Sequence, residues 1–279
     1  MKSEQHLQSL LAGQERIPVP VLFEDPHMAV VCKPQRLATV GKGEVTLNHC
    51  LPLLMKIDPG PDPLWRAKEV HRLDKPTGGL VVCGKTKLAV RRLCDAFGAH
   101  AVRKTYTAVV AGRLQGAGTC DRPVDNKAAL TRFCVLEHAP SKRYQWVTLV
   151  ELQPETGRTH QLRRHMAWLG HPILGDASYW EDGTRYSKEG LPPLLEGEGV
   201  KGQEAGLSAI ALWATAVALP HPCTGDLLAV TMPELPRQLR MCLDAGEMAR
   251  CLETECPQDV ARGWGGTEGR RKRAKVTLN

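Results

Sequence analysis

Short runs of apolar and β-branched residues, separated by turn-forming residues, recur along the chain and restrict its fold class. They predict strands at residues 28–32, 80–83, 106–110, 132–136, 146–152 and 227–230. Helical periodicity predicts helices at residues 87–97, 161–169 and 235–245, which should end at Gly98, Gly170 and Gly246. Strands outnumber helices. We therefore expect an α+β fold, a mixed and largely antiparallel sheet with flanking helices, rather than a wound series of β-α-β units.

The composition divides the chain into a central region and two polar ends. Residues 1–18 are polar and residues 251–279 are rich in glycine and basic residues, so we expect both ends to be poorly ordered. Residues 19–250 hold all the predicted strands and helices and are assigned to one domain, although 279 residues would also suffice for two small ones. Residues 181–208, rich in Gly, Glu and Pro, are predicted to be a long surface insertion.

The net charge of +7 is concentrated at one end of the chain. Five of these charges come from the short segment 270–275, at Arg270, Arg271, Lys272, Arg273 and Lys275. The rest of the chain is close to neutral, so a nucleic-acid surface there must be a local patch. The tail cluster has two further interpretations, a nuclear address or a phosphate-binding segment, beside the default of solvated charge.

Cysteine usage indicates a reducing compartment. The chain has ten cysteines, no CxxC pair and no apolar stretch of the signal-peptide type at its start. We expect unpaired thiols and a cytoplasmic protein, with a nuclear or organellar location left open. No apolar run is long enough to span a bilayer, so no membrane partner is expected. Cys242, Cys251 and Cys256 fit no common zinc spacing, and no metal site is predicted.

Two segments carry most of the chemistry, HRLDKPTGG at 71–79 and ETGRTHQLRRHMAWLGHPILGD at 155–176. The first holds a single carboxylate, Asp74, in a loop-forming run. The second is a cationic helix start that Thr159 can cap and whose first turns carry Arg158, Arg163 and Arg164. An Asp in such a run is commonly a turn residue. A lone acid facing arginines, without a nucleotide motif, nevertheless suggests chemistry by one carboxylate on an anionic polymer.

HRLDKPTGG, RKTYTAVVAGRL, TGRTHQLRRH and GHPILGD resemble, in order and spacing, the signature segments of the RluA-type RNA pseudouridine synthases. The resemblance extends to FEDPHMAVVCKP, DNKAALTRF and LPHPCTGD and so covers residues 19–235. Several linked segments are far more specific than one short motif. The resemblance implies that residues 19–250 form a pseudouridine synthase catalytic domain that isomerises uridines of transfer or ribosomal RNA without a metal or cofactor. We expect it to act as a monomer.

The resemblance assigns the reaction to Asp74. The bond from uracil N1 to the sugar must break, and the base must turn and rejoin through C5. Asp74 acts either as a nucleophile or as a base on the sugar, and both roles stay open. Arg163 is its expected partner, because a guanidinium can hold a carboxylate in a two-pronged contact. Tyr106 is expected to stack on the target base and assist exchange of the C5 proton; its structural alternative is a strand residue with its hydroxyl at a wet edge.

Four further residues are expected to bind RNA. Arg72 is placed to fill the space left by a flipped nucleotide or to bind a displaced phosphate. Arg158 has two interpretations, a phosphate contact or a residue that structures its turn. Leu162 and Arg164 belong to the same motif and complete the set, with a solvated helix face as the alternative for Arg164. The histidines are expected to be structural, namely His71, His160, His165 and His171.

Three positions depart from the family pattern. Arg36 stands near the glycine of the usual KPAGL-like turn, so that loop is expected to have a different shape. Gly78 occupies a position where serine is common. Trp213 occupies the position of a usual histidine, so the details of the pocket near it are not carried over from the family.

Two competing hypotheses belong to other functional classes. The first is an RNA-binding protein with an inactive site, which retention of Asp74, Tyr106 and Arg163 together argues against. The second is a metal-dependent hydrolase that uses His160 and His165. Elemental analysis and an assay with a chelator test this hypothesis: loss of activity in the chelator would favour a metal-dependent hydrolase, and unaffected activity would rule it out.

Overall fold

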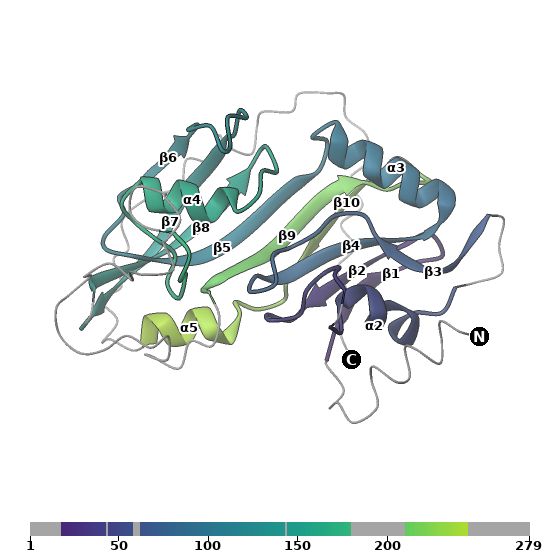
Figure 1. Ribbon diagram of the computed structural model, residues 1–279, viewed down its shortest axis with the longest axis horizontal. Coiled ribbons are helices and arrows are strands. Elements are labelled where there is room, and N and C mark those ends of the chain that lie inside the picture. Colours follow the sequence, from purple (N-terminus) through teal and green to yellow (C-terminus); the bar gives the residue numbers. More distant parts are fainter. Residues whose placement is uncertain (1–17, 43, 58–61, 143, 180–209, 245–279) are drawn as a thin grey trace.

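The structure is a computed structural model that describes residues 18–42, 44–57, 62–142, 144–179 and 210–244 (Figure 1). The polar start apart from Pro18, the predicted insertion at 181–208 and the basic tail at 251–279 lie outside these residues, as does Gly246. The boundaries predicted for those segments therefore remain predictions.

Ten strands form one sheet: β1 (Val21–Glu24), β2 (Met28–Lys33), β3 (Pro63–Glu69), β4 (Gly78–Thr86), β5 (Arg103–Ala111), β6 (Ala117–Cys120), β7 (Thr131–Ser141), β8 (Gln145–Pro154), β9 (Leu212–Pro220) and β10 (Leu227–Thr231). The order is β1-β2-β4-β9-β5-β8-β7-β6, while β3 pairs with β4 and β10 with β9. Only the pairing of β4 with β9 is parallel among these strands. The predicted mixed, largely antiparallel α+β sheet is confirmed.

Within the described residues, four helices flank the sheet: α2 (Leu47–Leu54), α3 (Lys87–Gly98), α4 (Gln161–Trp168) and α5 (Arg237–Asp244). α4 packs on β7 and β8, α5 on β5, β7 and β8, and α3 on β3 and β4 (Figure 1). None of these helices is long and apolar enough to cross a membrane. The cysteines that the structure describes are unpaired, as their pattern predicted.

The predicted runs fall within β2, β4, β5, β7, β8 and β10, and the predicted helices are α3, α4 and α5. The sequence analysis missed α2, which contains Pro52, a residue that normally argues against a helix interior. It also missed β9, whose LWATAVALP run is rich in alanine rather than β-branched residues. The other strands without a prediction are β1, β3 and β6.

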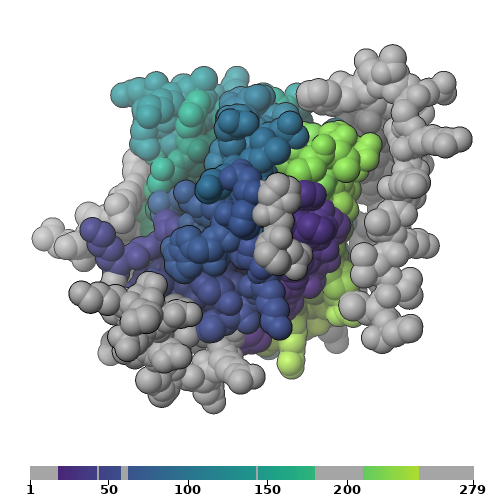
Figure 2. Space-filling model, turned by 90° about the vertical axis from the view of Figure 1, so that its right-hand side faces the viewer, coloured from purple at the N-terminus to yellow at the C-terminus, as the bar shows by residue number. Residues whose placement is uncertain are grey.

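The chain brings distant segments together at one end of the molecule. Seen from that end, the purple and blue residues of β1 to β4 lie beside the yellow-green residues of β9 and β10 (Figure 2). Asp25 and His221 join the two regions, with 2.7 Å between Oδ2 and Nε2. These residues belong to FEDPHMAVVCKP and LPHPCTGD, so two segments of the family resemblance meet in space.

Tyr106 marks the place where two buried apolar clusters meet. One cluster packs β5, β7 and β8 against α4 and α5, and the other packs β2 and β4 against α2. The ring of Tyr106 contacts both. The middle of the sheet, where β4, β9 and β5 adjoin, is therefore a fixed platform between two cores.

The parallel pairing of β4 with β9 depends on two glycines. Gly78 pairs with Trp213, and Gly79 pairs with Ala214. Gly79 has φ +113°, and a Cβ built on it would lie 2.2 Å from the carbonyl oxygen of Ala214. Only glycine permits this approach. It fixes the end of the loop that carries Asp74 against the central strand.

Candidate active site

Asp74 lies in the loop between β3 and β4, at the wall of a pocket of about 640 Å³. Its carbonyl oxygen accepts a hydrogen bond from the amide of Thr77 (3.0 Å), which closes a turn. Its side chain is 25% exposed, so the carboxylate faces the pocket and is only partly reached by water. A substrate group that enters this pocket would meet that carboxylate.

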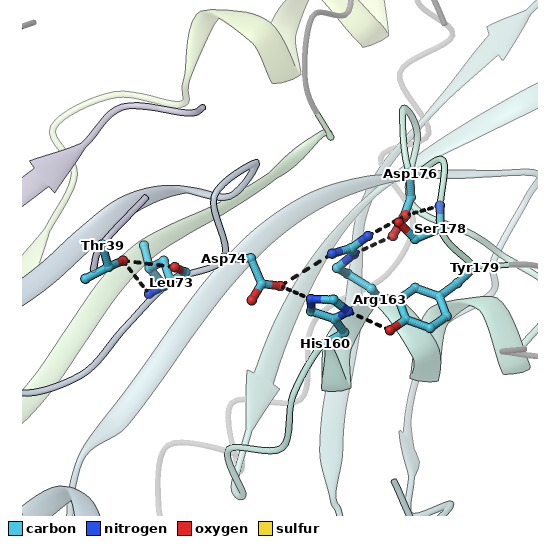
Figure 3. Close-up of polar contacts among 8 residues, drawn as sticks. All are labelled: Thr39, Leu73, Asp74, His160, Arg163, Asp176, Ser178 and Tyr179. Atoms are coloured by element: carbon cyan, nitrogen blue, oxygen red, sulfur yellow. Dashed lines mark hydrogen bonds and ion pairs between the residues drawn. The ribbon is translucent and has the colours of Figure 1, made fainter. Parts of the chain in front are cut away.

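Thr39 fixes the residue before Asp74 (Figure 3). Its Oγ1 donates to the carbonyl of Leu73 (2.9 Å) and accepts from the amide of Leu73 (3.1 Å), with Thr39 buried. Both peptide groups of one residue are thus held by one hydroxyl. The backbone that orients the side chain of Asp74 therefore has little freedom to rotate.

The loop that carries Thr39 is tied down by Lys33, whose side chain is fully buried. Its ammonium donates to the carbonyls of Pro34 (3.0 Å) and Leu37 (2.7 Å). Burial lowers the pKa of Lys33 to about 8, although the charge of Asp74 opposes the shift. In the same loop Arg36 has φ 65°, a left-handed conformation that favours glycine. Arg36 therefore takes up a conformation that a glycine would permit without strain, and the expected difference in loop shape from the family stays a prediction.

Arg163, on α4, holds a different carboxylate from the one expected. Its Nε and Nη2 donate to Oδ2 and Oδ1 of Asp176, both at 2.7 Å. Asp74 is reached only by the third nitrogen, with 3.6 Å between Nη1 and Oδ2 (Figure 3). The pairing with Asp74 exists, but the prediction of a two-pronged contact with it is wrong. Burial acts to lower the pKa of Arg163, and the hydrogen bonds and charge of Asp176 outweigh it and raise this pKa.

His160 completes the surroundings of Asp74. The sequence analysis expected only a structural role for it, because the spacing of the histidines does not indicate a site. Its Nε2 lies 3.6 Å from Oδ2 of Asp74, and its Nδ1 is hydrogen-bonded to the hydroxyl of Tyr179 (2.5 Å). His160 is also the N-cap of α4, with φ 55°, so the expected capping by Thr159 is wrong. A non-glycine residue in this conformation stores strain, which is common at functional sites.

Tyr106 lines the same pocket as Asp74. Burial, and then the charge of Asp74, raises the pKa of Tyr106 above its usual value. The phenol is therefore neutral at physiological pH. It offers a ring face and a hydroxyl donor rather than a phenolate base.

The predicted RNA-binding residues separate into two groups. Arg72, Arg158 and Leu162 line the pocket. Arg158 also donates from Nε to the carbonyl of Ala128 (2.9 Å), so it structures its turn as well. Arg164 is not among the pocket residues, because it is paired with Asp125 at 2.6 Å and stacked on Trp168.

Two other histidines, His71 and His165, are held by the fold. His71 accepts the amide of Val82 at Nε2 (3.0 Å) and stacks on Phe97, which confirms its structural role. Burial, and then the charge of Lys104, lowers the pKa of His71 to about 3, so the ring is neutral. His165 is fully buried, with its ring nitrogens engaged by Thr131 and the carbonyl of Arg122. These bonds leave His165 no nitrogen for a metal ion shared with His160.

The chain matches the family model described as RNA pseudouridylate synthase over residues 27–168. It is 35% identical over 246 residues to the ribosomal large subunit pseudouridine synthase D of Xanthomonas campestris, covering 84% of this chain and 71% of that protein. The protein of the same name from Vibrio cholerae is 32% identical over 254 residues, covering 86% and 74%. The chain belongs to the RNA pseudouridylate synthase family. It is therefore an isomerase that forms pseudouridine in RNA.

Solved structures agree with this assignment at the level of the fold. Human RNA pseudouridylate synthase domain containing 1 superposes with a TM-score of 0.61 at 24% identity, covering 88% of this chain and 94% of that one. Human RNA pseudouridylate synthase domain containing 4 gives a TM-score of 0.59 at 26% identity, covering 88% and 96%.

Gly78 and Trp213, two of the departures from the family pattern, are direct neighbours on paired strands. A Cβ built on Gly78 would lie 2.6 Å from the ring of Trp213, whose Nε1 donates to Gln238 on α5 (2.9 Å). The large indole thus occupies the volume that a serine side chain at position 78 would need. We infer that the glycine and the tryptophan depend on each other.

We expect Gly78→Ser to destabilise the protein by about 1–3 kcal/mol, the usual cost of overpacking. The same change should cost much less in a Trp213→His background, so the two substitutions should be non-additive. Urea unfolding of the two single variants and the double variant measures this. Gly98→Ser is the control, because a Cβ there meets nothing within 4 Å. Additive effects would show that the two positions are independent.

Proposed function

We propose that this pseudouridine synthase modifies uridines of large-subunit ribosomal RNA, with Asp74 as the reacting carboxylate. The observation that carries the proposal is the position of Asp74. It is a half-buried carboxylate in the wall of a 640 Å³ pocket, with Arg163 and His160 each 3.6 Å from the same oxygen. Relatives with 31% to 35% identity, named as ribosomal large subunit synthases, support the choice of RNA.

The reaction rearranges bonds without adding or removing atoms. The bond from N1 to C1′ breaks, the uracil turns, a bond from C5 to C1′ forms, the C5 proton leaves, and N1 ends protonated. As a nucleophile, Asp74 would form an ester at C1′ that C5 later displaces. As a base, it would take the C2′ proton and later return it. Both roles need a carboxylate oxygen that faces the sugar, and Nη1 of Arg163 lies 3.6 Å from Oδ2 of Asp74.

Tyr106 and the pocket walls keep the freed uracil in place. The neutral phenol of Tyr106 can stack on the base, and the reaction needs the pocket walls to retain the freed uracil until C5 reaches C1′. Because the pKa of Tyr106 is raised, proton removal from C5 by a Tyr106 phenolate is not favoured. We therefore assign Tyr106 to positioning of the base, with proton exchange helped only through its hydroxyl.

Arg72 and Arg158, with Leu162, are proposed to receive the flipped nucleotide, because they line the pocket. Arg164 is proposed to contact RNA only outside the pocket. No metal or cofactor enters the proposed steps. The expected compartment remains the cytoplasm, in keeping with the unpaired cysteines of the described residues.

Mapping of pseudouridines in cells with and without this protein tests the choice of RNA. We expect sites in the large-subunit RNA to disappear and the same sites to be restored by the purified protein on transcribed RNA. Sites lost only from transfer RNA would overturn the ribosomal assignment. Unchanged maps, together with RNA binding, would favour the inactive RNA-binding hypothesis.

A further inference from the structure

Lys104 is a pocket residue that the assignments above leave without a role. It lies on β5, two residues before Tyr106, and its side chain lines the same pocket as Asp74. Its Nζ would be 4.0 Å from a Cβ built on Gly157, so the ammonium lies over the backbone of the loop that leads into α4. Because residue 157 is a glycine, no side chain at that position covers the ammonium.

No carboxylate pairs with Lys104 among the residues that the structure describes. Arg163 has Asp176 and Asp74 near it, and Lys33 has two backbone carbonyls and the charge of Asp74. Lys104 has neither a hydrogen bond nor an ion pair to any residue that the structure describes. Burial alone lowers its pKa, and no carboxylate opposes the shift. A desolvated cation without a partner is costly, and an incoming anion would relieve that cost.

Basic residues make the pocket around Lys104 cationic. Arg72 and Arg158 line it together with Lys104, whereas His71 is neutral and adds no charge. Asp74 is the only carboxylate among the pocket residues within the part of the chain that the structure describes, and it faces Arg163 and His160. An RNA nucleotide turned out of its stack brings a phosphate on each side of its sugar.

We propose that Lys104 binds a backbone phosphate flanking the target uridine. This inference rests on the proposed function, because it takes the ligand to be a nucleotide whose sugar reaches Asp74. A lysine suits the role, since its ammonium is a compact charge that can follow a phosphate without fixed geometry. The contact forms only when the nucleotide occupies the pocket. Lys104 therefore helps to select RNA that has been opened at the target.

The first experiment measures the titration of Lys104 directly, without the need to know the RNA. Lysines of the full-length protein are ¹³C-methylated, and the signal that disappears in Lys104→Arg is assigned to Lys104. Uridine 3′,5′-bisphosphate should raise the pKa read from this signal, whereas uridine should leave it unchanged. An identical titration with both compounds would overturn the proposal.

The second experiment uses the ribosomal fragment that contains the mapped uridine. Lys104→Met should lower kcat/KM by about tenfold or more, as expected for loss of a charged hydrogen bond, and Lys104→Arg should recover most of it. Lys68→Met is the control, because it removes the same charge from an exposed position on β3. A structural lysine would lower the melting temperature when replaced. Removal of an unpaired, desolvated charge should leave it unchanged or raise it.

A methylphosphonate placed at the linkage on either side of the target uridine completes the test. At the linkage that Lys104 contacts, the neutral group should slow the native protein and leave Lys104→Met unaffected. Additive losses at both linkages would overturn the proposal. A native protein that forms no pseudouridine in the ribosomal fragment would instead overturn the proposed substrate, and the bisphosphate titration would still decide the role of Lys104.

Discussion

Asp74→Asn should abolish pseudouridine formation while leaving the fold intact. The amide has the size of the carboxylate, but it cannot attack C1′ or accept a proton from the sugar. We expect the single-turnover rate to fall by at least about a thousandfold, as for removal of a reacting group in other enzymes. Release of tritium from C5-labelled uridine in the RNA measures this rate.

The substitution should cost little stability. The polar contacts of the Asp74 side chain within the described part of the chain are ion pairs at 3.6 Å with Arg163 and His160. Asp62→Asn is a matched control, since it removes an exposed carboxylate that pairs with Lys87 on the surface. Unfolding curves of both variants should resemble that of the parent. Activity of Asp74→Asn within a few-fold of the parent would remove Asp74 from the mechanism.

The sequence could predict which segments meet at the site but not how their side chains pair. Asp74, Tyr106 and Arg163 line one pocket. Their segments could be recognised in the sequence by their resemblance to the family. The spacing along the chain does not reveal which carboxylate lies nearest a guanidinium. Asp176 was part of a recognised segment, yet its contact with Arg163 depends on how the chain turns back after α4.

Backbone conformation explains other differences. Arg36 is left-handed although it is not a glycine, and Lys33 and Thr39 fix the chain on either side of it, which the sequence could not show. The relation of Gly78 to Trp213 could not be seen, because β9 was missed and the two residues are far apart in sequence. Lys104 belongs to the recognised segment RKTYTAVVAGRL, but the motif did not indicate a role for it. A motif shows neither the burial of its side chain nor the lack of a partner among the described residues.

Arg163→Met should both destabilise the protein and slow its chemistry. It leaves the carboxylate of Asp176, whose side chain is 2% exposed, without its two hydrogen bonds from the guanidinium. Breaking a buried ion pair in this way costs about 3–5 kcal/mol. It also removes the cation nearest Asp74, for which we expect a loss in saturated rate on the order of a hundredfold. RNA binding should change much less, because one phosphate contact among many contributes little.

The two effects can be separated with Asp176→Asn. In the double variant Arg163→Met/Asp176→Asn the buried charge is gone, so urea unfolding should show that most of the lost stability returns. The rate should stay low, because Asp74 still lacks its cation. A double variant as unstable as Arg163→Met would mean that the unpaired charge of Asp176 is not the cause. If Arg163→Met bound RNA poorly yet reacted normally at saturation, Arg163 would be a phosphate contact, and the arrangement of Asp176, Arg163 and Asp74 would serve binding rather than catalysis.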